Sequence, residues 1–144
     1  MEKIYSKIES NLLLHVIHRF KDFDNMIDFR KEIIESNNFI QCAALKMNKG
    51  KTFKPHKHIV NEITDKDRIA QESWVVLRGK VKCVFYDIDD NIIAEPILEE
   101  GDCSFTLRGG HTYLILEDNT KVLEMKTGKY LGQKFDKIFI NNEK

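Results

Sequence analysis

The stretch GKTFKPHKH, which runs from Gly50 to His58, places two histidines two positions apart. Residues i and i+2 of an extended strand point to the same face, so the imidazoles of His56 and His58 can bind one ion together. A single histidine is more often an ordinary surface or core residue. The pair therefore indicates a metal site only if further ligands accompany it.

Two later stretches supply such ligands. The stretch ESWVVLRG begins with a carboxylate, Glu72, and the alternate residues Trp74 and Val76 of this predicted strand would share its face. Gly79 then permits a tight turn into the next strand. The stretch GDCSFTLRGGH ends in a third imidazole, that of His111, after another glycine-rich turn.

These spacings resemble those of the cupin family, whose first motif is glycine, five residues, His-x-His, three or four residues, glutamate, six residues and glycine. Gly50, His56 and His58 match the first part, and six residues separate Glu72 from Gly79 as the motif requires. The resemblance implies a small β-barrel, from about Gly50 to Thr127. Its divalent metal ion would be held by His56, His58, Glu72 and His111.

The glutamate position departs from the motif, because thirteen residues rather than three or four separate His58 from Glu72. Glu62 has the family spacing from His58 and is a rival ligand. However, Ile69 stands where the glycine that follows Glu62 should be, and the strand pattern starts only at Gln71. We therefore favour Glu72.

The second cupin motif is glycine, five residues, Pro-x-Gly, two residues, histidine, three residues and asparagine. Leu107 replaces its proline, one residue is missing between Gly109 and His111, and Ile115 occupies the asparagine position. His111 is nevertheless the one histidine that can serve as the third imidazole.

Among cupins, the sequence is most similar to the WbuC-type metalloproteins. The shared features are the long His-x-His-to-Glu loop and the stretches VVLRG (75–79), GGHT (109–112), EMKTGKY (124–130) and DKIF (136–139). This similarity covers roughly the C-terminal two thirds of the chain. It implies a role in surface-polysaccharide synthesis without assigning a reaction.

Three imidazoles and one carboxylate, with coordination positions left open, suit Fe(II), Mn(II), Ni(II) or Zn(II). These ligand types do not separate the four metals. The expected cofactor is therefore a divalent metal ion of undetermined identity.

From Phe39 onward, short β-branched and aromatic runs alternate with turn residues at spacings of about 8–12 residues, which is typical of antiparallel sandwiches and barrels. The predicted fold is mainly β, a single cupin (jelly-roll) barrel with a short N-terminal α/β extension. Residues 1–38 would form the extension, and residues 39–144 the barrel with its C-terminal tail. The charged segment Ile59–Ala70 is predicted to be a loop at the barrel mouth.

The N-terminal part is less regular. Its apolar residues recur at alternate positions (Leu12, Leu14 and Val16), which favours a strand, although the run LLLHVI also suits a short helix. A helix is predicted from Asp22 or Asp24 through Ser36, packing on the barrel with Met26, Phe29, Ile33 and Ile34.

Composition excludes some classes of partner. The 144 residues include 23 basic and 23 acidic side chains, so no net charge attracts nucleic acid or an anionic membrane. The charged start MEKIYSKIES and the absence of a long apolar run predict neither a signal peptide nor a membrane span. The odd set Cys42, Cys83 and Cys103 fits reduced thiols, so we expect a cytoplasmic protein.

Three residues are candidates for substrate binding. Lys54 is in phase with the two histidines, and Arg108 lies just before His111, so either could bind an anion such as an acidic sugar or a sugar nucleotide. Trp74 could stack on a ring, although inward aromatic residues in small barrels usually fill the core.

The expected ligand is a small molecule, and the leading hypothesis is a metal-dependent isomerase or epimerase acting on a sugar or sugar-nucleotide intermediate of surface-polysaccharide synthesis. No catalytic acid or base can be assigned. An Fe(II)-dependent dioxygenase acting on a small acid and a non-catalytic metal- or sugar-binding module are the alternatives. Exposed sheet edges and the apolar segment Phe135–Ile140 predict a homodimer.

Overall fold

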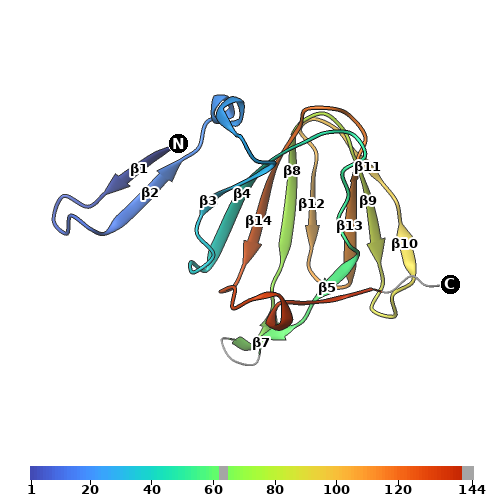
Figure 1. Cartoon of the computed structure of the whole chain (residues 1–144). Coiled ribbons are helices and arrows are strands. Elements are labelled where there is room, and N and C mark those ends of the chain that lie inside the picture. Colours follow the sequence, from blue (N-terminus) through green and yellow to red (C-terminus); the bar gives the residue numbers. More distant parts are fainter. Residues whose placement is uncertain (62–64, 141–144) are drawn as a thin grey trace.

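A computed structural model of the chain describes residues 1–61 and 65–140. Within them, two antiparallel sheets form a sandwich with almost no helix (Figure 1). This arrangement confirms the mainly β, jelly-roll fold expected from the sequence. No helix in the described residues is long and apolar enough to cross a membrane.

The first sheet, called sheet I, contains in spatial order β12 (Cys103–Thr106), β8 (Glu72–Arg78), β14 (Thr120–Thr127), β4 (Ile40–Met47) and β3 (Arg30–Ile34). The second sheet, called sheet II, runs through β10 (Ile92–Ala94), β9 (Val81–Tyr86), β13 (Gly110–Ile115), β5 (His56–His58) and β15 (Lys137–Phe139). A short strand, β11 (Ile97–Leu98), also pairs with β9.

Two small hairpins lie outside these sheets, formed by β1 (Glu2–Tyr5) with β2 (Leu13–Ile17) and by β6 (Val60–Asn61) with β7 (Asp65–Ile69). The described helices are both short 3-10 helices, η1 (Phe20–Asn25) and η2 (Gln133–Phe135). Strand β2 confirms the extended interpretation of the LLLHVI run. The segment predicted as a loop, Ile59–Ala70, forms the β6–β7 hairpin in its described part.

The prediction of a helix from Asp22 or Asp24 through Ser36 is wrong. Its residues divide between η1 and β3, and β3 pairs with β4 along the edge of sheet I. Ile33 packs there with Phe23 and Ala44, and Phe23 and Ala44 are fully buried. Pairing with β4 satisfies the backbone groups of β3, so tertiary contacts override the helical spacing of the apolar residues. Sheet I consequently begins before residue 39.

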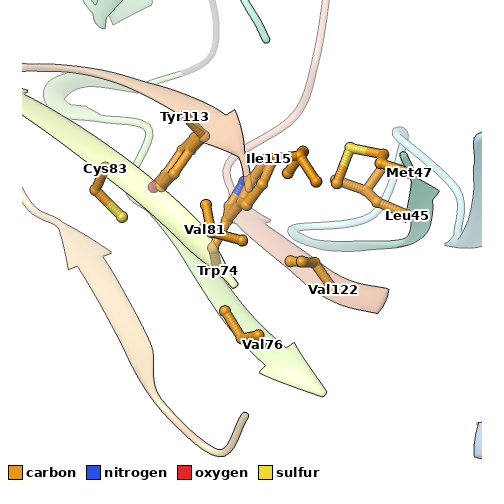
Figure 2. Packing of buried hydrophobic residues seen from close by; sticks show 9 residues of the cluster. All are labelled: Leu45, Met47, Trp74, Val76, Val81, Cys83, Tyr113, Ile115 and Val122. Carbon is orange, nitrogen blue, oxygen red and sulfur yellow. The ribbon is translucent and has the colours of Figure 1, made fainter. Parts of the chain in front are cut away.

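The main hydrophobic core lies between the two sheets (Figure 2) and consists of inward side chains from both, namely Leu45, Met47, Trp74, Val76, Val81, Cys83, Tyr113, Ile115 and Val122. Each large apolar side chain buried in this way contributes about 1.5–3 kcal/mol. Because side chains alternate along a strand, Trp74 shares its face with Glu72, and Tyr113 shares its face with His111. The core therefore continues directly into the polar cluster described below.

The turn from β8 to β9 depends on Gly79, which has a positive φ of 85°. A Cβ at this position would overlap Oγ1 of Thr120, at the start of β14. Glycine is thus required both for the backbone conformation and for the close approach of the two chain segments.

Candidate metal centre

The structure brings together the four residues predicted as metal ligands. His56 and His58 lie on β5, His111 lies on β13 and Glu72 lies on β8. One possible ligand atom from each residue lies within 4.8 Å of the others. All four side chains are buried, with exposed fractions of 0–7%. Glu62, the rival ligand, lies outside the described residues.

Strand pairing explains why these residues meet. In sheet II, His111 is directly opposite His56, and the ring centroids of the two residues lie 4.5 Å apart. Glu72 reaches the histidines from sheet I, with Oε2 at 3.3 Å from Nε2 of His58 and Oε1 at 3.2 Å from Nε2 of His111. The cluster therefore bridges the two sheets.

The surroundings of Glu72 favour its ionised form. Burial alone would raise the pKa of its carboxyl group, but the neighbouring His111 and His58 outweigh burial and hold that pKa well below its usual range. A buried carboxylate among imidazoles is a hard, anionic ligand.

His111 shows that a metal ion fits the cluster. Its side chain is fully buried, and neither ring nitrogen has a hydrogen-bond partner within the described part of the chain. The contact between its Nε2 and Glu72 is close but lacks hydrogen-bond geometry. An unsatisfied buried polar group costs about 1–3 kcal/mol. Coordination of an ion by Nε2 would remove that cost at this nitrogen.

The other two imidazoles are oriented by contacts at Nδ1. Nδ1 of His56 lies 3.0 Å from the carbonyl oxygen of Lys54. Nδ1 of His58 lies 3.3 Å from the carbonyl oxygen of Asp136 and 3.5 Å from its carboxylate. Donation from Nδ1 leaves the Nε2 lone pair available for an ion, which is the usual arrangement for metal-bound histidine.

These surroundings give the two histidines of β5 different proton affinities. Burial, followed by the charge of Lys137 and the neighbouring His111, lowers the pKa of His56 to about 4. Burial also disfavours protonation of His58, but Asp136 and Glu72 outweigh it and raise the pKa of His58. His56 is therefore neutral at physiological pH and ready to act as a ligand.

A cavity of about 330 Å³ lies beside the cluster, and two of its four residues, His56 and Glu72, line it. Aromatic and charged side chains dominate its wall, which is formed by Arg30, Glu32, Ser36, Gln41, Phe53, His56, Glu72, Trp74, Tyr113, Glu124, Lys126, Tyr130 and Lys137. The four-residue cluster thus faces a space large enough for a small organic molecule.

Of the three predicted substrate-binding residues, Trp74 reaches this cavity. It is only 1% exposed and stacks on Tyr113, with ring centroids 3.9 Å apart and an interplanar angle of 7°. Lys54 and Arg108 are exposed and do not line the cavity. The Nζ atom of Lys54 lies instead 5.6 Å from the ring centroid of Phe139. The substrate-binding roles of all three residues stay predictions.

Sequence reasoning missed the charged residues of the cavity wall, chiefly Glu124, Lys126 and Lys137. One signal could have revealed two of them. Glu124 and Lys126 alternate in phase with Val122, a fully buried core residue on the same strand. Charged residues at inward positions of a strand indicate a polar cavity rather than a continuous core.

No family model matches the sequence, and no curated protein matches it. Similarity appears at the level of solved structures. KdgF from Halomonas sp. is 16% identical, with a TM-score of 0.55 over 71% of this chain and 79% of that one. The capsular polysaccharide assembling protein CapF from Staphylococcus aureus is 20% identical, with a TM-score of 0.60 over 77% of this chain. Oxalate decarboxylase from Bacillus subtilis is 13% identical, with a TM-score of 0.55 over 72% of this chain.

The chain has the cupin fold. It covers only 31% of CapF and 24% of oxalate decarboxylase, so it is similar to one part of each of those longer proteins. The buried cluster of three histidines and one glutamate is typical of a cupin metal site. The narrower similarity to WbuC-type cupins stays a prediction.

Proposed function

We propose that this cupin is a metal-dependent isomerase or epimerase acting on a sugar or sugar-nucleotide intermediate of surface-polysaccharide synthesis. The observation that carries the proposal is the buried cluster of three histidines and one glutamate, which opens onto a cavity with aromatic and charged side chains in its wall. The likeness of the fold to CapF, which is described as a capsular polysaccharide assembling protein, supports the polysaccharide context.

His56, His58, Glu72 and His111 would hold the ion. A divalent ion bound there would polarise a substrate carbonyl or bind adjacent oxygens. Glu72 is engaged by two imidazoles, so a different group must move the proton that isomerisation or epimerisation requires.

Glu124 is suited to carry that proton. It lines the cavity, its side chain is 15% exposed, and it lies opposite Trp74 in the register of β14 and β8. Burial, followed by the charge of Glu72, raises the pKa of Glu124. Arg30, whose Nη1 lies 2.8 Å from Oε1 of Glu124, fixes the position of the carboxyl group. A raised pKa brings a carboxyl group closer to the range in which it exchanges protons at neutral pH.

The test is incubation of metal-loaded protein with a panel of sugars, sugar acids and nucleotide sugars in D₂O. Because both proposed reactions remove a proton from carbon, proton NMR should show metal-dependent loss of one carbon-bound signal. Glu124→Gln should abolish this exchange while keeping the metal. Absence of exchange and of product across the panel would contradict the proposal. Metal-dependent oxygen consumption would favour a dioxygenase, and a ligand-induced thermal shift without turnover would favour a binding module.

We also propose that the chain forms a homodimer. The apolar segment Phe135–Ile140 is partly covered within the chain, because β15 pairs with β5 and Ile140 is buried. The β1–β2 hairpin supports the proposal better, since it stands apart from the sandwich (Figure 1). Five of its apolar side chains are 39–51% exposed, those of Ile4, Tyr5, Leu12, Leu13 and Leu14. An isolated two-stranded hairpin is marginally stable in water, so a second copy that covers it would stabilise it. A monomer in sedimentation velocity at micromolar concentration would overturn this proposal.

A further inference from the structure

Lys137 is the first residue of β15 and lies directly opposite His58 of β5. Its ammonium group lines the cavity and donates a hydrogen bond to Nε2 of His56, with a distance of 3.2 Å between the two nitrogens. Lys137 therefore reaches the same nitrogen that His56 would offer to a metal ion, because Nδ1 of His56 faces the carbonyl oxygen of Lys54.

Lys137 differs in one respect from the other two cations of the cavity wall. Arg30 is paired with Glu124 at 2.8 Å, and Lys126 is paired with the carboxylate of Asp136 at 3.0 Å. Among residues 1–60 and 69–140, whose side chains the structure describes, no carboxylate lies within 4.0 Å of the Lys137 ammonium group. In the described cavity wall, it is thus the cation without an acidic partner.

Metal binding would make this arrangement unfavourable unless something else enters the cavity. An ion bound to Nε2 of His56 occupies the lone pair that accepts the hydrogen bond from Lys137. The ammonium group is then left without its acceptor and close to a second positive charge. An unpaired cation in a partly desolvated site is costly. A ligand anion that contacts both the ion and the ammonium group removes both costs.

We infer that Lys137 binds a carboxylate group of the ligand beside the metal centre, so that the cavity takes an acidic sugar or a small hydroxy acid. This inference rests on the metal site of the proposed function and names the ligand class for it. A carboxylate suits the site better than a doubly charged phosphate, because Arg30 and Lys126 are already paired with Glu124 and Asp136, and Lys137 faces a wall that also holds Glu32 and Glu72. The extra negative charge of a phosphate would be repelled by those carboxylates.

The experiment uses the full chain, purified without a histidine tag or chelator and loaded with Co(II), whose visible absorption responds to a ligand at an open coordination position. The protein is titrated with glycolate, with its neutral counterpart ethylene glycol, and with inorganic phosphate. We expect glycolate to change the spectrum at concentrations at least tenfold lower than ethylene glycol or phosphate. Cobalt content is measured on every sample.

Lys137→Met should keep the cobalt and weaken glycolate binding at least tenfold, with no change for ethylene glycol. Lys137→Arg, which keeps the charge, should bind glycolate nearly as well as the unmodified chain. This second variant keeps the test valid if Lys137→Met does not fold. Lys49→Met is the matched control, because Lys49 is exposed outside the cavity and its removal should leave glycolate binding unchanged.

Several outcomes would overturn the inference: no cobalt binding, no preference for glycolate over ethylene glycol, tighter binding of phosphate than of glycolate, or equal glycolate binding by folded Lys137→Met and the unmodified chain. Failure of the proposed enzymatic function would look different. Glycolate binding that depends on Lys137, with no proton exchange or product in the D₂O panel, would contradict the enzyme and leave the carboxylate site intact. Metal-dependent turnover of neutral sugars alone, by a chain whose cobalt spectrum does not respond to glycolate, would support the enzyme and contradict the carboxylate site.

Discussion

Glu72 and His111 come from opposite sheets, and yet Oε1 of Glu72 lies 3.2 Å from Nε2 of His111. This contact brings a carboxylate whose pKa is lowered, and an imidazole without a hydrogen-bond partner in the described part of the chain, to one point inside the sandwich. An ion at this point would join sheet I to sheet II, so metal binding and stability of the fold should be linked.

We expect His111→Ala to abolish tight metal binding, because it removes a fully buried imidazole that lies against both Glu72 and His56. Metal analysis of untagged protein purified without chelator should give one divalent ion per chain for the unmodified protein and a small fraction of that for the variant. His15→Ala, at an exposed position on β2, is the control and should keep the metal. Retention of one ion per chain by His111→Ala would contradict the assigned site.

Asp136 should make the metal-free protein sensitive to acid. Burial by itself would raise the pKa of its carboxyl group, but His58 and Lys126 outweigh burial and lower that pKa to about 2 from an ordinary value of 3.8. A depressed folded-state pKa stabilises the fold above the unfolded-state value, and this stability is lost as pH falls from about 4 to about 2. The loss should be about 2 kcal/mol.

The measurement is urea unfolding of metal-free protein across that pH range. Asp136→Asn should be less stable than the unmodified chain at pH 6 and should lack this part of the acid dependence. In the metal-loaded protein the same change should weaken metal affinity about 10–100-fold, because it removes the carboxylate charge that lies 3.5 Å from Nδ1 of His58. Glu100→Gln, an exposed acid outside the site, should behave like the unmodified protein.

Trp74 should contribute strongly to stability, because it is 1% exposed and packs between Phe53 and Tyr113. Trp74→Ala should lower the free energy of unfolding by about 3–5 kcal/mol. Circular dichroism is the suitable probe, since the variant loses the single tryptophan of the chain. Phe105→Ala on the neighbouring strand β12 removes a side chain that is 67% exposed, and it should cost under about 0.5 kcal/mol.

A pair of glycine substitutions separates backbone strain from steric overlap. Gly79 and Gly101 have similar positive φ values of 85° and 94°, but a Cβ would overlap Thr120 only at Gly79 and would meet open space at Gly101. Gly101→Ala should therefore cost about 1–3 kcal/mol, from strain alone. Gly79→Ala should lower the melting temperature clearly further. Equal melting temperatures would show that Thr120 moves aside without cost.

The cluster was predictable because its residues stand in short local patterns that resemble the two cupin motifs. The spacing of His56 and His58 places both imidazoles on one face, and Glu72 opens a strand with a clear alternation. The helix prediction failed because the spacing of the apolar residues around Ile33 fits both a helix and a strand. Pairing of β3 with β4 makes this segment a strand. A single sequence does not show which strand will offer a free edge.

Lys137 and Glu124 escaped prediction for a different reason. Lys137 contacts His56, which lies 81 positions earlier in the sequence, and Arg30 near the N-terminus pairs with Glu124 near the C-terminus. Such contacts depend on which strands become neighbours and in what register. Lys54 and Arg108 are closer in sequence to the histidines, but their side chains lie outside the cavity.

The position of β15 in the sequence determines when the site is completed during synthesis. During synthesis, all four ligands leave the ribosome before Asp136 and Lys137 do, because β15 follows β5, β8 and β13 in the chain. A nascent chain that has not yet released β15 therefore has its ligands but lacks the group that orients His58 and the cation that faces His56. Of the described strands, β15 is thus the last to be made, and the surroundings of the four-residue cluster are complete only once it has been synthesised.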